Sequence, residues 1–348
     1  MQVRFNIVRQ NPNSSPRIQT YTLEVNPGNT ILDCLNRIKW EQDGTLAYRK
    51  NCRNTICGSC AMRINGRTAL ACKENIGREI ERLNKIAAQA NNSKAPQQID
   101  SIPEMTIAPM GNMPVIRDLV VDMSSFWANL EAVEPYVSSE ARQIPEREFL
   151  QTPEEREQLN QTGNCILCGA CYSECNAREV NPDFVGPHAL AKAYRMVADS
   201  RDTKTESRLE KYNQGTFGVW GCTRCFNCNA VCPMEVAPLD QITKIKSEIL
   251  ARKDESSSQP IRHRKLLLEF VKDGGWIEER KFATQLFTYS FAGYKELAKL
   301  LPLGFRMLIR GKLPKKFVPS KGTKEVRSLI ESIQKLNKQS FSKKPDKN

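Results

Sequence analysis

The chain has 348 residues, of which 40% are hydrophobic and 26% are charged, which is enough for two globular domains and an extension. No window approaches the roughly 18 uninterrupted apolar residues of a membrane span, and the N-terminus has neither the basic start nor the apolar run of a secretory signal. These features argue against a membrane-spanning helix and against a secretory signal, and we expect a cytoplasmic protein of prokaryotic type.

The net charge of +13 is confined to the C-terminal quarter of the chain. Residues 256–348 carry 21 Lys or Arg and 8 Asp or Glu, whereas the first 255 residues carry 31 of each sign. Any electrostatic partner is therefore expected to meet the C-terminal segment.

The first elements in chain order indicate a small α+β domain. Short strands are expected at residues 3–8, 20–25, 61–64 and 68–71. The first two of these alternate apolar and polar side chains, as half-buried strands do. Thr30 is a suitable N-cap for a helix over residues 31–38. We place this domain at residues 1–118.

A polar helix is expected near residues 75–90, and the Asn-, Ser- and Pro-containing run 91–98 that follows is interpreted as a surface insertion or linker. A further helix is expected over residues 120–131.

From about residue 150 the pattern becomes helical. Helices are expected to begin at Pro153, Pro187 and Pro238, where a proline occupies the first helical position. We predict a second, α-helical domain at 119–255 and a basic helical extension at 256–348. The polar, Lys-rich stretch from Lys335 is expected to be disordered.

Twelve of the thirteen cysteines fall in three tight groups, and Cys34 alone stands apart. Disulfide frameworks belong mainly to secreted proteins, whereas clustered Cys-x-x-Cys spacing in a cytosolic protein favours metal binding. Cysteines two or three residues apart pair poorly with each other but can converge on one centre. Cys34, on the apolar helix 31–38, is interpreted as a small buried thiol.

The first group has plant-type ferredoxin spacing, which predicts a [2Fe–2S] cluster. Its expected ligands are Cys52, Cys57, Cys60 and Cys72. The small residues Gly58 and Ser59 would let backbone N–H groups approach the cluster sulfides and tune the potential. A zinc site is the alternative, but zinc motifs favour paired Cys-x2–4-Cys knuckles.

The second and third groups each have the ladder of bacterial two-cluster ferredoxins, in which three cysteines bind one cluster and the fourth binds the other. One cubane is expected on Cys165, Cys168, Cys171 and Cys232. The other is expected on Cys175, Cys222, Cys225 and Cys228. Two zinc sites are the alternative, and two complete ladders argue against it.

Several segments resemble the iron–sulfur subunit of the succinate dehydrogenase and fumarate reductase family. Cys52–Met62 is similar to the family's [2Fe–2S] loop, and Met113–Met123 to its interdomain segment. Gly186–Pro187, Ala193–Arg195 and Asp199–Asp202 resemble the helix between its two ladders.

This resemblance covers roughly residues 1–255. It implies a β-grasp ferredoxin domain followed by an α-helical ferredoxin domain. It also implies a separate FAD-containing flavoprotein that oxidises succinate to fumarate and passes single electrons through the three clusters of this chain toward a quinone. The expected setting is peripheral, on the cytoplasmic side of a prokaryotic membrane, on an anchor subunit or on the membrane surface itself.

The chain departs from the resemblance at the last cluster and at the quinone pocket. Many relatives replace the middle cysteine of the third ladder by an apolar residue and hold a [3Fe–4S] cluster there. Because Cys225 is present, we expect a second [4Fe–4S] cluster. The alternative is [3Fe–4S] with Cys225 free. Asn176 and Thr223 stand where many relatives have Pro and His, so no quinone residues are assigned.

No catalytic residue is expected in this chain. It has no Gly-x-Gly-x-x-Gly after a strand, and His188 and His263 are its only histidines. The alternatives to a succinate dehydrogenase subunit are a fumarate reductase subunit, a ferredoxin-like carrier for another flavoprotein or thiol-linked reductase, and a zinc-binding interaction module.

The extension mixes apolar and basic side chains over residues 282–314. Phe305, Leu308 and Ile309 share a helical face, with Arg306 and Arg310 beside one another. This pattern favours docking on an anionic membrane surface or an anchor subunit, or else a helix that caps the chain's own core. No nucleic-acid-binding motif is present, and no nucleic-acid partner is expected.

Overall fold

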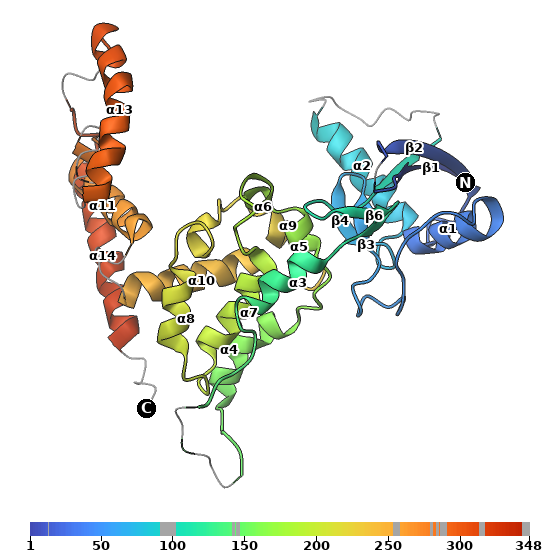
Figure 1. Cartoon of the computed structure of the whole chain (residues 1–348), viewed down its shortest axis with the longest axis horizontal. Helices are drawn as coiled ribbons and strands as arrows, with labels where there is room; N and C mark the ends of the chain where they lie inside the picture. Colours follow the sequence, from blue (N-terminus) through green and yellow to red (C-terminus); the bar gives the residue numbers. More distant parts are fainter. Residues whose placement is uncertain are drawn as a thin grey trace. The chain divides into compact units, whose positions relative to one another are not determined.

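The computed structural model describes residues 1–12, 14–90, 102–140, 143, 147–252, 258–278, 281–282, 285, 291–312 and 317–342. It divides the chain into two compact units, Met1–Lys246 and Ser247–Asn348 (Figure 1). The run 91–98 lies outside the described residues. The domain boundaries at 118 and 255 stay predictions.

The first unit begins with a five-stranded mixed sheet. Its strands are β1 (Gln2–Arg9), β2 (Arg17–Glu24), β3 (Ala61–Ile64), β4 (Arg67–Leu70) and β5 (Glu104–Ala108), in the order β2-β1-β5-β3-β4. The pair β1–β5 is parallel and the other pairs are antiparallel. Three helical segments accompany the sheet: α1 (Ile31–Arg37), the π-helical turn η1 (Ile38–Gln42) and α2 (Ile76–Ala90).

The sheet forms where period-two patterning places apolar side chains on one face. In β1, Val3, Phe5 and Ile7 are fully buried and alternate with partly exposed residues. Thr30 closes a capping box at the start of α1: its hydroxyl accepts from the Asp33 N–H at 3.1 Å, and the Asp33 carboxylate accepts from the Thr30 N–H at 3.0 Å. The predicted α+β class and the N-terminal domain are confirmed.

The helix expected over 120–131 begins later than predicted. A two-stranded ribbon, β6 (Val115–Arg117) with β7 (Val120–Val121), precedes α3 (Ser124–Glu131). The β-branched Val115 pairs with Val121 across this ribbon, and Arg117 pairs with Val120. The Asp122 carboxylate then accepts from the Ser124 N–H at 2.8 Å and marks the helix start.

The rest of the first unit is helical, as predicted. Its helices are α4 (Pro153–Gly163), α5 (Ala170–Ser173), α6 (Asn176–Val180), α7 (Pro187–Ala198), α8 (Thr205–Tyr212), the 3-10 turn η2 (Val219–Gly221), α9 (Asn227–Ala230) and α10 (Pro238–Arg252), which runs on past the unit boundary. Each of the three predicted proline starts is the first residue of a helix. Short helices alternate with cysteine loops, so the cysteines lie between packed elements.

A polar cluster joins the sheet to the helical part of this unit. The Arg63 guanidinium on β3 donates to the Glu174 carboxylate at 2.8 and 3.2 Å, and the Thr68 hydroxyl on β4 donates to it at 2.6 Å. Asn112 donates to the backbone carbonyls of Tyr172 and Cys175 at 2.9 and 3.1 Å. The segment leading to Cys175 is therefore fastened to the N-terminal sheet.

Replacing Glu174 by glutamine is expected to lower the free energy of unfolding by roughly 1–3 kcal/mol. Arg63 is 38% exposed, so water offsets part of the loss. Burial acts to raise the pKa of the Glu174 carboxyl, but hydrogen bonds from Arg63 and Thr68 outweigh it, and the net pKa is lowered. The stabilisation is therefore complete at neutral pH and is lost as pH falls through the lowered pKa.

Chemical unfolding of the anaerobic holoprotein, at neutral pH and in acid, measures this effect. The difference between the wild type and Glu174→Gln should shrink in acid. Glu104→Gln is the matched control, because its ion pair with Arg4 is exposed on both sides and should contribute little. An equal loss for both variants would contradict the prediction.

The second unit contains α11 (Gln259–Gly274), α13 (Phe291–Ile309) and α14 (Thr323–Ser342). Helices α11 and α14 pack together, and the Arg327–Asp273 pair at 3.3 Å and the Lys272–Glu331 pair at 3.4 Å connect them. No helix among the described residues combines the length and the apolarity that crossing a bilayer requires.

The prediction that the chain is disordered from Lys335 onward is wrong for residues 335–342, because α14 continues to Ser342. Residues 343–348 lie outside the described part. The apolar spacing of Leu329, Ile333 and Leu336 continues the helical period past Lys335, so the polar composition alone was misleading.

Candidate iron–sulfur centres

The loop from Cys52 to Cys60 turns its backbone donors onto its own sulfurs. The Cys57 and Asn54 N–H groups donate to the Cys52 Sγ at 3.3 Å each, and the Ser59 hydroxyl donates to the Cys57 Sγ at 3.1 Å. Backbone in the left-handed region makes these turns possible; it occurs at Arg53, Thr55 and Gly58.

Cys72 completes this group from the end of β4. The Thr55 hydroxyl lies 3.9 Å from the Cys72 Sγ, and the Ala71 N–H donates to the Cys60 carbonyl at 3.1 Å. Burial raises the pKa of the Cys60 thiol to about 12, and the neighbouring Cys72 and Cys57 add to the rise. The four predicted ligands thus lie together.

The donor set fits a cluster held by thiolates. Burial acts to raise the pKa of the Cys57 thiol, but the hydrogen bonds from Ser59 and Cys52 outweigh it and lower the pKa to about 6. N–H and O–H groups aimed at sulfur stabilise the negative charge that a ligating thiolate carries.

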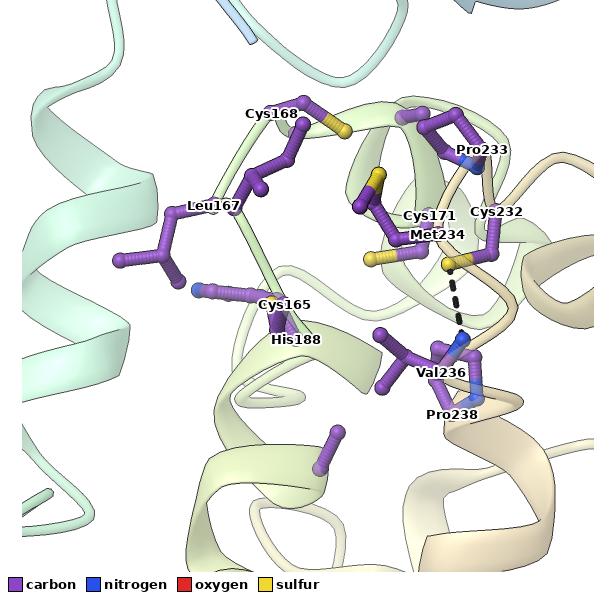
Figure 2. Close-up of a pocket in the computed structure, with 14 residues that line it drawn as sticks. Cys165, Leu167, Cys168, Cys171, His188, Cys232, Pro233, Met234, Val236 and Pro238 are labelled. Atoms are coloured by element: carbon purple, nitrogen blue, oxygen red, sulfur yellow. Dashed lines mark hydrogen bonds between the residues drawn. The ribbon is translucent and has the colours of Figure 1, made fainter. Parts of the chain in front are cut away.

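The four cysteines predicted for the first cubane line one pocket. Cys165, Cys168, Cys171 and Cys232 gather around this space together with Pro233, Met234 and Val236 (Figure 2). The Val236 N–H donates to the Cys232 Sγ at 3.3 Å. Burial raises the pKa of the Cys168 thiol to about 11, and Cys165 and Cys232 add to the rise. Cys232, the fourth cysteine of the third ladder, therefore lies with the first three cysteines of the second ladder.

Conversely, Cys175, the fourth cysteine of the second ladder, lies with the first three cysteines of the third ladder. Burial raises the pKa of the Cys175 thiol to about 11, and Cys222 and Cys225 push it in the same direction. Burial likewise raises the pKa of Cys228 to about 12, with Cys222, Cys175 and Cys225 contributing. Cys175 and Cys228 are buried and Cys225 is exposed, so this site is only partly shielded from water, and the potential of an iron–sulfur cluster depends on such exposure.

The two ladders share a local backbone conformation that spacing alone does not reveal. The residues on either side of Cys168, Leu167 and Gly169, have φ of 55° and 82°, and those on either side of Cys225, Arg224 and Phe226, have φ of 59° and 66°. A short helix follows each of these turns and carries the third cysteine of its ladder, and the two helices, α5 and α9, pack together. Cys225 thus has the local backbone setting of Cys168. A left-handed Phe226 costs roughly 1–2 kcal/mol, so the packing must hold this turn in place.

His188 lines the first cubane pocket, which the sequence analysis missed. Its ring stacks on Phe126 with centroids 3.9 Å apart, and its Nε2 donates to the Phe126 carbonyl at 2.9 Å. The Nδ1 has no hydrogen-bond partner among the described residues. Burial lowers the pKa of this imidazole to about 3, so the ring is neutral. The sequence places His188 directly after Pro187, in the first turn of the predicted helix, and this position was the feature that could have indicated it.

The [2Fe–2S] loop touches the second ladder directly. A Cβ added to Gly58 would lie 2.7 Å from the Cys168 Cβ and 2.8 Å from its Cα. The two predicted centres therefore approach each other because residue 58 has no side chain.

Among the described residues, no three His, Cys, Asp or Glu side chains close around a position for a single metal ion. Cys34 is buried on α1, as expected, and burial raises the pKa of its thiol to about 12.

Two family models match the chain. Residues 4–128 match the 2Fe-2S iron-sulfur cluster binding domain, and residues 161–236 match the 4Fe-4S dicluster domain. The chain is therefore an iron–sulfur electron-transfer protein with [2Fe–2S] and [4Fe–4S] domains.

Among solved structures, a chain of the Mycobacterium smegmatis Sdh1 complex in the apo form is similar at 24% identity and a TM-score of 0.59, over 72% of this chain and 97% of that one. This likeness concerns the fold. A hypothetical protein from Helicobacter pylori matches at 15% identity and a TM-score of 0.46, over 76% of this chain and 43% of that one, too weak a likeness to carry an argument. The two domains and the shared fold confirm the resemblance to the iron–sulfur subunits of the succinate dehydrogenase and fumarate reductase family.

Proposed function

We propose that this chain is the iron–sulfur subunit of a succinate dehydrogenase. It takes single electrons from an FAD-containing flavoprotein subunit that oxidises succinate to fumarate, and passes them toward a membrane quinone. The observation that carries this proposal is the order of contacts. The [2Fe–2S] loop touches the second ladder through Gly58 and Cys168, and the second and third ladders exchange their fourth cysteines.

Each ligand set has a defined position in this relay. The set Cys52, Cys57, Cys60 and Cys72 would hold the [2Fe–2S] cluster that meets the flavoprotein. Cys165, Cys168, Cys171 and Cys232 would hold the middle [4Fe–4S] cluster, and Cys175, Cys222, Cys225 and Cys228 the last one. When bound, the clusters accept and release single electrons, and the protein positions them and sets their potentials.

The residues around the ligands prepare the site for that chemistry. Donors such as the Ser59 hydroxyl and the Val236 N–H stabilise thiolate charge. Burial of Cys175 and Cys228 shields part of the last centre from water, whereas Cys225 is exposed. The polar cluster at Glu174 holds the N-terminal sheet against the segment that ends at Cys175.

The subunit would work as a peripheral protein on the cytoplasmic side of a prokaryotic membrane. Asn176 and Thr223, beside Cys175 and Cys222, lack the proline and histidine of many relatives. We therefore assign no quinone residues and expect a variant membrane partner or quinone geometry.

Succinate-dependent reduction tests the proposal. The anaerobically purified chain, combined with a co-expressed succinate-oxidising flavoprotein, should show the reduced [2Fe–2S] EPR signal after succinate is added. Cys60→Ser should abolish that signal, whereas Cys34→Ser, which alters a buried thiol outside the three groups, should leave it unchanged. Reduction only by a dithiol or by another flavoprotein would overturn the proposal and favour the carrier alternative. The measured reduction potentials of the clusters would distinguish a succinate dehydrogenase subunit from a fumarate reductase subunit.

A further inference from the structure

The C-terminal half of α13 exposes a continuous apolar side. Leu301, Phe305, Leu308 and Ile309 are 68, 66, 65 and 70% exposed. At about 3.6 residues per turn they lie along one side of the helix. Within its own unit, this side of α13 is therefore uncovered.

Basic residues flank this apolar side at the C-terminal end of α13. At about 100° per residue, Arg306 lies about 100° from Phe305 and about 60° from Ile309, and Arg310 follows one turn later, directly after the last helical residue. Lys312 is two residues further on, and Leu303, which is 55% exposed, lies on the far side of the helix. Within its unit, α13 extends beyond α11 and α14 (Figure 1). An apolar side flanked by Arg and Lys is typical of a helix that lies flat in a membrane interface.

Charge selects the partner that such a helix fits. Residues 256–348 carry the entire surplus of 13 positive charges, so a second copy of this unit would be repelled. An anionic phospholipid surface offers negative headgroups to the arginines and an acyl boundary to the apolar side chains. The long Arg and Lys side chains can reach the headgroups while the apolar ones are buried.

We propose that α13 binds the surface of an anionic phospholipid bilayer, with Leu301, Phe305, Leu308 and Ile309 in the acyl boundary and Arg306, Arg310 and Lys312 at headgroup level. The proposal rests on the proposed function only for its purpose, which is to bring the last cluster to a membrane acceptor. The contact itself needs neither succinate nor a flavoprotein.

Vesicle flotation with the full-length, cluster-loaded chain tests this proposal. We expect binding to vesicles of phosphatidylglycerol and phosphatidylcholine that falls steeply with added salt, and little binding to phosphatidylcholine alone. The pair Phe305→Ser and Leu308→Ser, and separately the pair Arg306→Glu and Arg310→Glu, should each weaken binding about tenfold or more. Tryptophan fluorescence of Phe305→Trp should shift to the blue on binding.

The matched control replaces exposed apolar residues of the first unit. Ile18→Ser with Leu150→Ser removes side chains that are 67 and 81% exposed, and it should leave binding unchanged. Circular dichroism and the cluster spectrum confirm that each variant is folded. Equal binding to neutral vesicles, full binding by either α13 pair, or self-association through α13 in sedimentation would overturn the proposal. Intact succinate-dependent reduction without vesicle binding would reject this surface and leave the proposed function standing.

Discussion

Replacing Gly58 by alanine is expected to slow electron transfer from the [2Fe–2S] centre to the middle [4Fe–4S] centre by on the order of tenfold or more. The added methyl group would lie 2.7 Å from the Cys168 Cβ and 2.8 Å from the Cys168 Cα. The Cα is a backbone atom and cannot move aside by a side-chain rotation. The two loops must therefore separate. Electron tunnelling between two centres weakens exponentially with the distance between them, so this separation slows the transfer. Freeze-quench EPR after a pulse of reductant measures the transfer.

Gly66→Ala is the matched control for this experiment. Gly66 has φ of +82°, close to the +70° of Gly58, but an added Cβ meets no atom within 4 Å there. Both variants should lose roughly 1–2 kcal/mol of stability from left-handed backbone strain. Only Gly58→Ala should slow the transfer. Equal rates in the two variants would show that the Gly58–Cys168 contact does not control the spacing of the centres.

Replacing Cys225 by serine is expected to remove one iron from the last cluster. The wild type should hold about ten irons per chain, two in the first cluster and four in each of the others. The variant should hold about nine and give a three-iron EPR signal after oxidation, because a cubane that lacks one thiolate readily loses the iron which that thiolate held. The potential of the last centre should change with its net charge.

The structural argument for this result is the local backbone. Arg224 and Phe226 take the left-handed conformation that Leu167 and Gly169 take around Cys168. Cys34→Ser is the control, because Cys34 is 1% exposed on α1 and should leave the iron content unchanged. A wild-type protein with about nine irons and a full three-iron signal would show that Cys225 is free and that the last cluster is [3Fe–4S].

The elements that depend on near neighbours in the chain could be predicted from the sequence. Thr30 and Thr152 cap helices because their hydroxyls accept N–H groups three residues on. Prolines at first helical positions mark the starts of α4, α7 and α10 for the same local reason. The closely spaced cysteines of each group follow from spacing within one short segment, which limits how far apart their sulfurs can lie, whereas Cys72 joins the first group across β3 and β4.

Contacts between distant segments could not be predicted in this way. The approach of Gly58 to Cys168 joins residues 110 positions apart, and it depends on how the sheet packs on the helical part. The same packing stacks His188 on Phe126 at the wall of the cubane pocket. Spacing and capping therefore determined which residues gather locally, while the tertiary structure decided which centres meet. It also decided that one side of α13 stays uncovered within its own unit, because burial depends on all the neighbours that an element finds.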